Sequence, residues 1–223
     1  MNIPQHYTPP GARKAKLHYY LHLPKPNATL TDNGWPLIVF LHGSGERGRD
    51  LRKLRQHGLP KRIAQGHDIP AIVVSPQCPL GSWWTPHFGA IMGLIDTIVA
   101  TQKIDPKRIY LTGLSMGGYG CWELASQYPQ RFAAIVPICG GGRKQFGFPA
   151  RVNMLRHMPI WAFHGALDAI VPPHESEVLI KTLRRCGGSP RYTLYPDLAH
   201  DCWSAAYAEP ALFAWLFEQK MLG

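Results

Sequence analysis

Residues 110–120 have the sequence Tyr110-Leu111-Thr112-Gly113-Leu114-Ser115-Met116-Gly117-Gly118-Tyr119-Gly120. The apolar run before it predicts a buried strand, and the residues from Tyr119 onward predict a helix. Ser115 lies at the break, with glycines two residues before and two after it. Side chains at those glycine positions would collide with the strand and the helix of a sharp turn. The pattern therefore predicts a nucleophile elbow, with an exposed serine hydroxyl on a strained turn.

Apolar runs of strand length alternate with helical patterns along the whole chain. Strands are expected at 17–23, 35–41, 71–75, 133–138, 159–163 and 191–195, and helices near 88–99, 119–125, 172–186 and 212–216. This alternation predicts an α/β fold with a mostly parallel central sheet and helices on both faces. Residues 1–14 are expected to be loosely tied, which would leave 17–23 as an edge strand. No repeat or linker divides the chain, so a single domain over residues 1–223 is expected.

Composition narrows the classes of function. No stretch approaches the roughly 18–20 apolar residues of a membrane span, and the N-terminus lacks the features of a signal peptide, so we expect no membrane span and a cytoplasmic protein. The formal net charge is +10, but the basic run at 47–62 lacks interleaved aromatic residues, which favours a solvated face over nucleic-acid binding. The five cysteines show no C-x-x-C spacing, which argues against a metal site or a disulfide framework. One local bridge stays open, and so does a homodimer.

A serine hydroxyl needs a base, and the base needs an acceptor that holds its tautomer. In parallel sheets the crevice lies outside the carboxyl ends of the strands. His200, in the polar loop after the last strand, is the base favoured by position. Asp168, which follows the preceding strand, is the favoured acid, with Asp201 and Asp197 as lesser candidates. The resulting order along the chain is Ser, Asp, His.

An oxyanion hole requires two hydrogen-bond donors near the serine. The backbone N–H of Met116, directly after the nucleophile, is the first expected donor. The second is expected from the glycine-rich loop His42–Gly48, most plausibly at Ser44. This loop lacks the G-K-[ST] of a phosphate cradle, so an oxyanion role is favoured.

Four motifs in order carry a family resemblance: His42–Gly48, Gly113–Gly118, His164–Asp168 and His200–Trp203. Together they resemble the α/β-hydrolase superfamily, in particular phospholipase/carboxylesterase and dienelactone-hydrolase-like serine esterases. The resemblance implies an α/β-hydrolase fold and serine carboxylesterase chemistry through an acyl-enzyme on Ser115, without a cofactor. Relatives with dienelactone activity carry cysteine in the elbow, which argues against that substrate here. The segment 140–159 is too short for the large lid of true lipases.

The substrate is expected to be a small-molecule ester. Trp83, Trp84 and Trp203 flank loops at the predicted crevice and are candidates for stacking on an aryl group or sugar, as in feruloyl or acetyl-xylan esterases. Gly141 is a candidate for lining the acyl pocket. Short- to medium-chain or aryl esters are therefore expected. A thioesterase, a lysophospholipase or a peptidase is the alternative, and a non-catalytic basic binding protein on the same fold is a remoter one.

Overall fold

The computed structural model describes residues 2–11, 16–25 and 33–221. Eight strands form one sheet in the order β1-β2-β4-β3-β5-β6-β7-β8. The strands are β1 (Asn2–Tyr7), β2 (Leu17–His22), β3 (Trp35–Leu41), β4 (Ile72–Pro76), β5 (Ile104–Leu114), β6 (Ala134–Ile138), β7 (Trp161–Gly165) and β8 (Arg191–Tyr195). β1 and β2 are antiparallel to their neighbours, whereas the six strands from β4 to β8 in the sheet run parallel. The expected mostly parallel sheet is confirmed.

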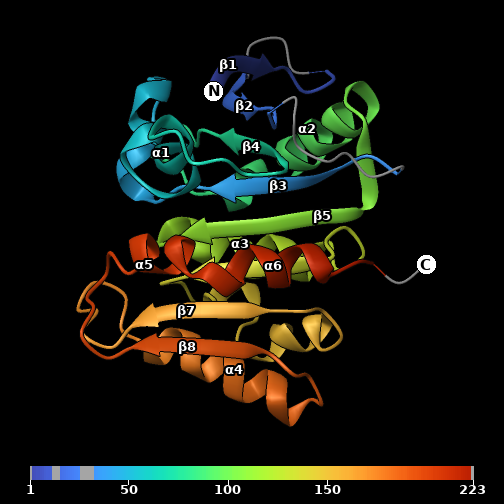
Figure 1. Cartoon of the computed structure of the whole chain (residues 1–223). Helices are drawn as coiled ribbons and strands as arrows, with labels where there is room; N and C mark the ends of the chain where they lie inside the picture. The colour runs from blue at the N-terminus through green and yellow to red at the C-terminus, as the bar shows by residue number, and fades with distance from the viewer. Residues whose placement is uncertain (1, 12–15, 26–32, 222–223) are drawn as a thin grey trace.

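Helices cover both faces of this sheet (Figure 1). They are α1 (Gly58–Ala64), α2 (Phe88–Thr101), α3 (Met116–Gln127), α4 (His174–Arg185), α5 (Trp203–Ala208) and α6 (Pro210–Glu218), with 3-10 turns η1 (Ser44–Glu46), η2 (Leu51–Gln56), η3 (Thr85–His87), η4 (Lys144–Phe146) and η5 (Ala150–Leu155). One hydrophobic cluster packs α2, α3 and α4 against the sheet, and a second packs α1, α5 and α6. Among the described residues, no helix combines the length and apolar character needed to cross a bilayer.

Strand β3 shows why the apolar runs predict this arrangement. Leu37, Val39 and Leu41 belong to the first cluster, whereas Ile38 and Phe40 belong to the second. Side chains alternate across a strand, so a continuous apolar run has a core on each face. The run is explained by burial on both sides.

The expectation of a loosely tied N-terminus is wrong for the residues that the structure describes. β1 pairs with β2 over its whole length, from Asn2 opposite His22 to Tyr7 opposite Leu17. Most of β1 faces solvent or is only partly buried, so no apolar run marks it in the sequence. The strand expected at 17–23 is therefore an inner strand and not the edge.

The parallel strands all end at one edge of the sheet. The arrowheads of β3, β5, β7 and β8 point to this same edge, on the left of Figure 1. The chain between β6 and β7 folds onto the body, because Phe148, Val152 and Leu155 are buried in the first cluster. Within the described ranges, no large lid stands over this edge.

Candidate active site

Ser115 lies on a strained turn between β5 and α3. Its φ is 53° and its ψ is −118°, a conformation that is rare for a residue with a side chain. Its N–H donates to the carbonyl of Ile138 at 2.9 Å. A Cβ atom on Gly117 would lie 1.9 Å from the Leu41 carbonyl oxygen, so the first turn of α3 touches the end of β3 backbone to backbone. The glycine spacing in the sequence is explained by this close approach.

The structure brings Ser115, His200 and Asp168 into one hydrogen-bonded line. His200 Nε2 lies 2.8 Å from Ser115 Oγ, and His200 Nδ1 lies 2.6 Å from Asp168 Oδ2. The three side chains come from the β5–α3 turn, the β8–α5 loop and the β7–α4 loop, all at the carboxyl edge. The other acid candidates, Asp197 and Asp201, are exposed, and no hydrogen bond joins them to His200 in the described part of the chain.

Asp168 is held by its own loop. Its Oδ1 accepts backbone N–H groups of Ile170 and Val171, both at 2.9 Å, which leaves Oδ2 for His200. Burial opposes ionisation of Asp168, but the hydrogen bonds from His200, Val171 and Ile170 outweigh it. The pKa of Asp168 is therefore lowered from its ordinary value, and the group is a carboxylate at neutral pH.

His164 contacts the loop that carries Asp168, and this contact was not predicted from the sequence. Its Nε2 donates to the Val171 carbonyl at 2.8 Å and lies 3.2 Å from Asp168 Oδ2. Its Nδ1 lies 2.8 Å from the hydroxyl of Ser176. Burial lowers the pKa of His164, so the ring is neutral at neutral pH, and the Ser176 hydroxyl beside it donates to the Gly140 carbonyl at 2.8 Å. The four-residue spacing from His164 to Asp168 is the only sequence signal for this arrangement.

The glycine-rich loop lies beside the serine. A Cβ atom on Gly43 would come within 3.5 Å of Ser115 Cβ, and Ser44, the next residue, is exposed at the start of η1. His42 anchors the loop, because Nδ1 donates to the Gly43 carbonyl at 2.5 Å and Nε2 accepts from the Cys78 N–H at 2.9 Å. Burial lowers the pKa of His42 to about 4, which keeps this tautomer at neutral pH. Both expected oxyanion donors thus lie on backbone that borders Ser115.

The three tryptophans have different roles. Trp84 is 1% exposed and donates its Nε1–H to the His42 carbonyl at 3.0 Å. The expected substrate contact of Trp84 is therefore corrected, because this ring is buried under the loop and supports it. Trp203 is 8% exposed and stands edge-on to His200, with ring centroids 5.3 Å apart, so it is a wall of the site. Trp83 is 42% exposed and keeps a surface for a ligand.

Trp83 is held by a partly buried ion pair between Arg143 and Glu123. The Arg143 guanidinium lies between two rings, 4.7 Å from the centroid of Trp83 and 4.5 Å from that of Phe146. Its Nε and Nη2 each donate to Glu123 at 2.7 Å, and Glu123 is buried on α3, the helix that follows Ser115. The pair joins residues 20 positions apart, and no motif marked it in the sequence. It fixes the orientation of an exposed aromatic face.

Gly141, the expected acyl-pocket residue, is buried beside α4. A Cβ atom there would lie 2.7 Å from Glu175 Oε2 and 3.1 Å from a ring carbon of Tyr119. Glu175, with Asp168 and Glu123, adds to burial in raising the pKa of Tyr119 to about 12, so this phenol is neutral. Gly141 therefore leaves space between Tyr119 and Glu175.

One group in the described residues has metal-ligand spacing. Cys139, His164 and Asp168 place one ligand atom each within 4.8 Å of one another. Asp168 already binds His200 through one oxygen and two N–H groups through the other, and His164 donates to Val171. These contacts assign Asp168 and His164 to the support of His200 and not to a metal, and Cys139 contacts the thiol of Cys202.

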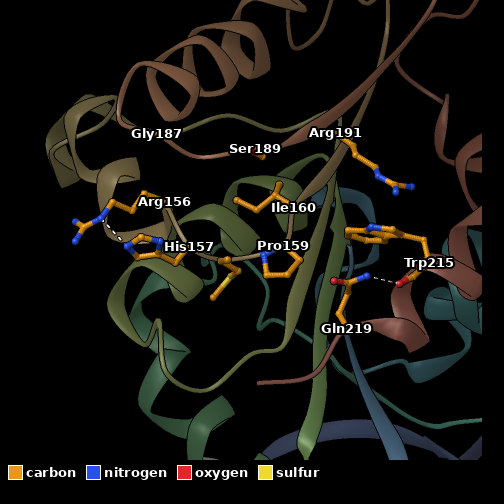
Figure 2. A pocket seen from close by; sticks show the side chains of 10 residues that line it. Arg156, His157, Pro159, Ile160, Gly187, Ser189, Arg191, Trp215 and Gln219 are labelled. Carbon is orange, nitrogen blue, oxygen red and sulfur yellow. Dashed lines mark hydrogen bonds between the residues drawn. The ribbon is translucent and has the colours of Figure 1, made fainter. Parts of the chain in front are cut away.

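A hollow of about 380 Å³ lies away from the serine. Figure 2 shows it at the amino ends of β7 and β8, between Arg156 and His157 on one side and Arg191, Trp215 and Gln219 on the other. None of Ser115, Asp168 and His200 lines it. This hollow is at the opposite end of the sheet and is not the candidate active site.

Comparisons with known proteins identify relatives of this chain. It is 29% identical over 149 residues to poly(3-hydroxyalkanoate) depolymerase C of Paucimonas lemoignei, and the match covers 60% of this chain and 34% of the depolymerase. It is also 29% identical over 154 residues to a bifunctional acetylxylan esterase/xylanase of Neocallimastix patriciarum, and this match covers 67% of this chain and 22% of that protein. The chain thus spans about a third of the first relative and about a fifth of the second.

A solved structure of a thermostable esterase superposes with a TM-score of 0.81 at 33% identity, covering 98% of this chain and 63% of that one. This likeness confirms the expected α/β-hydrolase fold. The model of the phospholipase/carboxylesterase family matches residues 86–209, more than half of the chain, and this range includes Ser115, Asp168 and His200. The chain belongs to the phospholipase/carboxylesterase family of the α/β-hydrolase superfamily.

Proposed function

We propose that this protein is a serine carboxylesterase in which Ser115 is the nucleophile, His200 the general base and Asp168 the acid that holds His200. One observation carries the proposal: the line from Ser115 Oγ through His200 to Asp168, with separations of 2.8 and 2.6 Å, ends on a serine with a strained backbone. A packed core does not require such a conformation at a solvent-reachable serine, whereas nucleophilic attack does.

The proposed reaction has two halves. Ser115 Oγ attacks the ester carbonyl carbon while its proton moves to His200 Nε2, and the carbonyl oxygen becomes an oxyanion bound by the N–H groups of Met116 and Ser44. His200 then gives its proton to the leaving oxygen, so the alcohol departs and the acyl group stays on Ser115. Water repeats the sequence and releases the acid. The net reaction is ester plus water to acid plus alcohol.

Asp168 acts in this scheme by fixing a tautomer. Its carboxylate accepts the Nδ1–H of His200, which leaves Nε2 unprotonated and facing Ser115. The lowered pKa of Asp168 keeps that acceptor charged when His200 carries the second proton. Trp203, edge-on to the imidazole, limits rotation of the ring.

For the substrate we propose short- to medium-chain or aryl carboxylic esters. Two features support this class: the described residues form no large lid over this edge that would cover a long acyl chain, and the exposed face of Trp83 is fixed by Arg143. The acetylxylan esterase relative is consistent with small acyl groups. We also propose that residues 1–223 form a single domain, because one sheet carries both core clusters.

The test is a substrate panel with a serine variant. The purified protein is assayed on p-nitrophenyl acetate, butyrate, octanoate and palmitate, on methyl ferulate and on an acyl thioester, and is labelled with a fluorophosphonate. We expect turnover of the shorter or aryl oxygen esters and labelling that Ser115→Ala abolishes, with an activity loss of at least about 1,000-fold. Full activity in Ser115→Ala would refute the mechanism, and preference for palmitate or the thioester would refute the substrate class.

A further inference from the structure

Two cysteines that are far apart in sequence meet behind the candidate active site. The Sγ atoms of Cys139 and Cys202 lie 2.9 Å apart, across a separation of 63 residues. Their side chains are 0% and 1% exposed. A disulfide bond requires about 2.0 Å between the sulfur atoms, so a shift of less than about 1 Å would close it.

The pair lies between two segments that carry the candidate site. Cys139 follows β6, where its N–H donates to the Phe163 carbonyl at 2.9 Å, and its neighbour Ile138 accepts the N–H of Ser115. Cys202 comes two residues after His200 and directly before α5. A bond between them would therefore fasten the loop that carries His200 to the strand that positions Ser115.

Buried cysteines often pack simply as small apolar residues. Cys121 is an example, since it is buried in the first core cluster and makes no sulfur–sulfur contact in the described chain. Cys139 and Cys202 differ because the two thiols face each other and share one contact within the second cluster. The two sulfur atoms are thus close enough that cross-linking needs only a small shift, a proximity that simple packing does not require.

We propose that Cys139 and Cys202 form a disulfide when the chain folds in the presence of a small-molecule disulfide such as oxidised glutathione. The thiolate of one cysteine attacks the glutathione disulfide and releases one glutathione. The second cysteine then attacks the mixed disulfide at the protein sulfur and releases the other. Two protein thiols thereby lose two protons and two electrons, and one glutathione disulfide becomes two glutathione thiols.

Folding is the stage at which this exchange occurs. In the folded chain the hydrogen bond to Cys202 and burial raise the pKa of Cys139, and both sulfurs are shielded from solvent. A buried neutral thiol is a poor nucleophile, so exchange is slow after folding and a bond once formed is protected. The inference goes beyond the proposed function, because it requires no catalytic role for His200.

The experiment refolds the full chain from guanidinium chloride with either a glutathione redox pair or dithiothreitol. Thiols are then counted in denaturant, and a tryptic digest is mapped without reduction. We expect the count to fall from five with dithiothreitol to three with glutathione. We also expect one linked pair of peptides, residues 132–143 and 192–220, which contain Cys139 and Cys202. The bond should raise the unfolding temperature by about 5–15 °C.

Variants separate this bond from general effects of oxidation. Cys139→Ala should lose both the linked peptides and the difference in unfolding temperature between the two refolding conditions. Cys186→Ala, which removes a partly exposed cysteine outside the pair, should keep both. Five free thiols in folded protein after glutathione refolding, or a link between other cysteines, would overturn the proposal. If Cys139→Ala does not fold, the peptide map of the unmodified chain decides the question alone.

Discussion

Replacing Asp168 with Asn changes one polar group of the candidate site and leaves its shape intact. In the native chain Oδ1 accepts two backbone N–H groups, from Ile170 and Val171, and Oδ2 accepts from His200 Nδ1. The single oxygen of the amide will take the first position, because two donors point at it. The NH2 group then faces His200 and forces its proton from Nδ1 to Nε2. In that tautomer His200 cannot accept the proton of Ser115.

The size of the effect follows from the cost of turning the amide around. The active tautomer requires the oxygen to face His200, which leaves two N–H donors facing an NH2 group. An unsatisfied buried donor costs about 1–3 kcal/mol, so the reversal costs about 2–6 kcal/mol in total. Since about 1.4 kcal/mol corresponds to a factor of ten, kcat should fall between about 30-fold and about 20,000-fold.

The assay is kcat on p-nitrophenyl acetate, together with the free energy of unfolding in urea. Asp201→Asn is the matched control, because Asp201 is next to His200 in sequence but exposed. We expect Asp168→Asn to fold and to lose activity, and Asp201→Asn to stay within about threefold of the unmodified protein. Activity of Asp168→Asn within threefold of the unmodified protein, or an equal loss in Asp201→Asn, would refute the tautomer argument.

Four further changes probe the supports of the site. Ser44→Pro removes a backbone N–H at the first position of η1, where proline is tolerated. It should lower kcat about 100- to 1,000-fold, whereas Ser44→Ala, which keeps the N–H, should not. Equal losses in the two variants would exclude the Ser44 N–H as an oxyanion donor. Burial lowers the pKa of His42 to about 4 in the folded chain, so the free energy of unfolding decreases as pH falls from about 6.5 toward 4. Between pH 7.5 and 5.5 the decrease caused by His42 is about 1 kcal/mol. Urea unfolding of His42→Gln at the two pH values should lack this decrease. Trp83→Ala should raise KM for aryl esters more than for alkyl esters of equal acyl length, and equal changes would count against an aryl contact. Gly117→Ala places a Cβ atom 1.9 Å from the Leu41 carbonyl oxygen, so thermal unfolding should show a loss of more than about 3 kcal/mol.

Strands were predictable where the segment carries its own apolar or aromatic residues, as in the buried β3 and in the edge strand β8. The expected bounds of β3 and β8 agree with the structure, and the glycine spacing around Ser115 identified the turn. β1 could not be found, because it is a mostly exposed edge strand that is stabilised by pairing with β2 and not by its own apolar residues. Its existence depends on a neighbour and not on a local pattern.

Candidate site residues could be predicted from their position at the ends of strands. Residue type alone did not show which tryptophan side chains face the site. Trp83 and Trp84 are adjacent and chemically identical, yet one is exposed and the other is buried against His42. The sequence does not reveal which ring points inward, since that depends on the direction in which the loop leaves β4. The Arg143–Glu123 pair was missed for a similar reason, because it forms only when the segment after β6 meets α3.

The backbone contact between the first turn of α3 and the end of β3 has a consequence for protein engineering. Ser115 takes its position from main-chain atoms that touch directly, with no side chain between them. Substitutions that resize core residues under the helix should therefore move the hydroxyl very little. The loop of His200 also touches backbone, since a Cβ atom on Gly165 would lie 2.2 Å from the Ala199 carbonyl oxygen. The imidazole itself, however, packs edge-on against Trp203, so repacking around that ring will disturb the imidazole first. In directed evolution for new esters, core residues under α3 can therefore be varied with little effect on Ser115, whereas substitutions around His200 will need compensating changes.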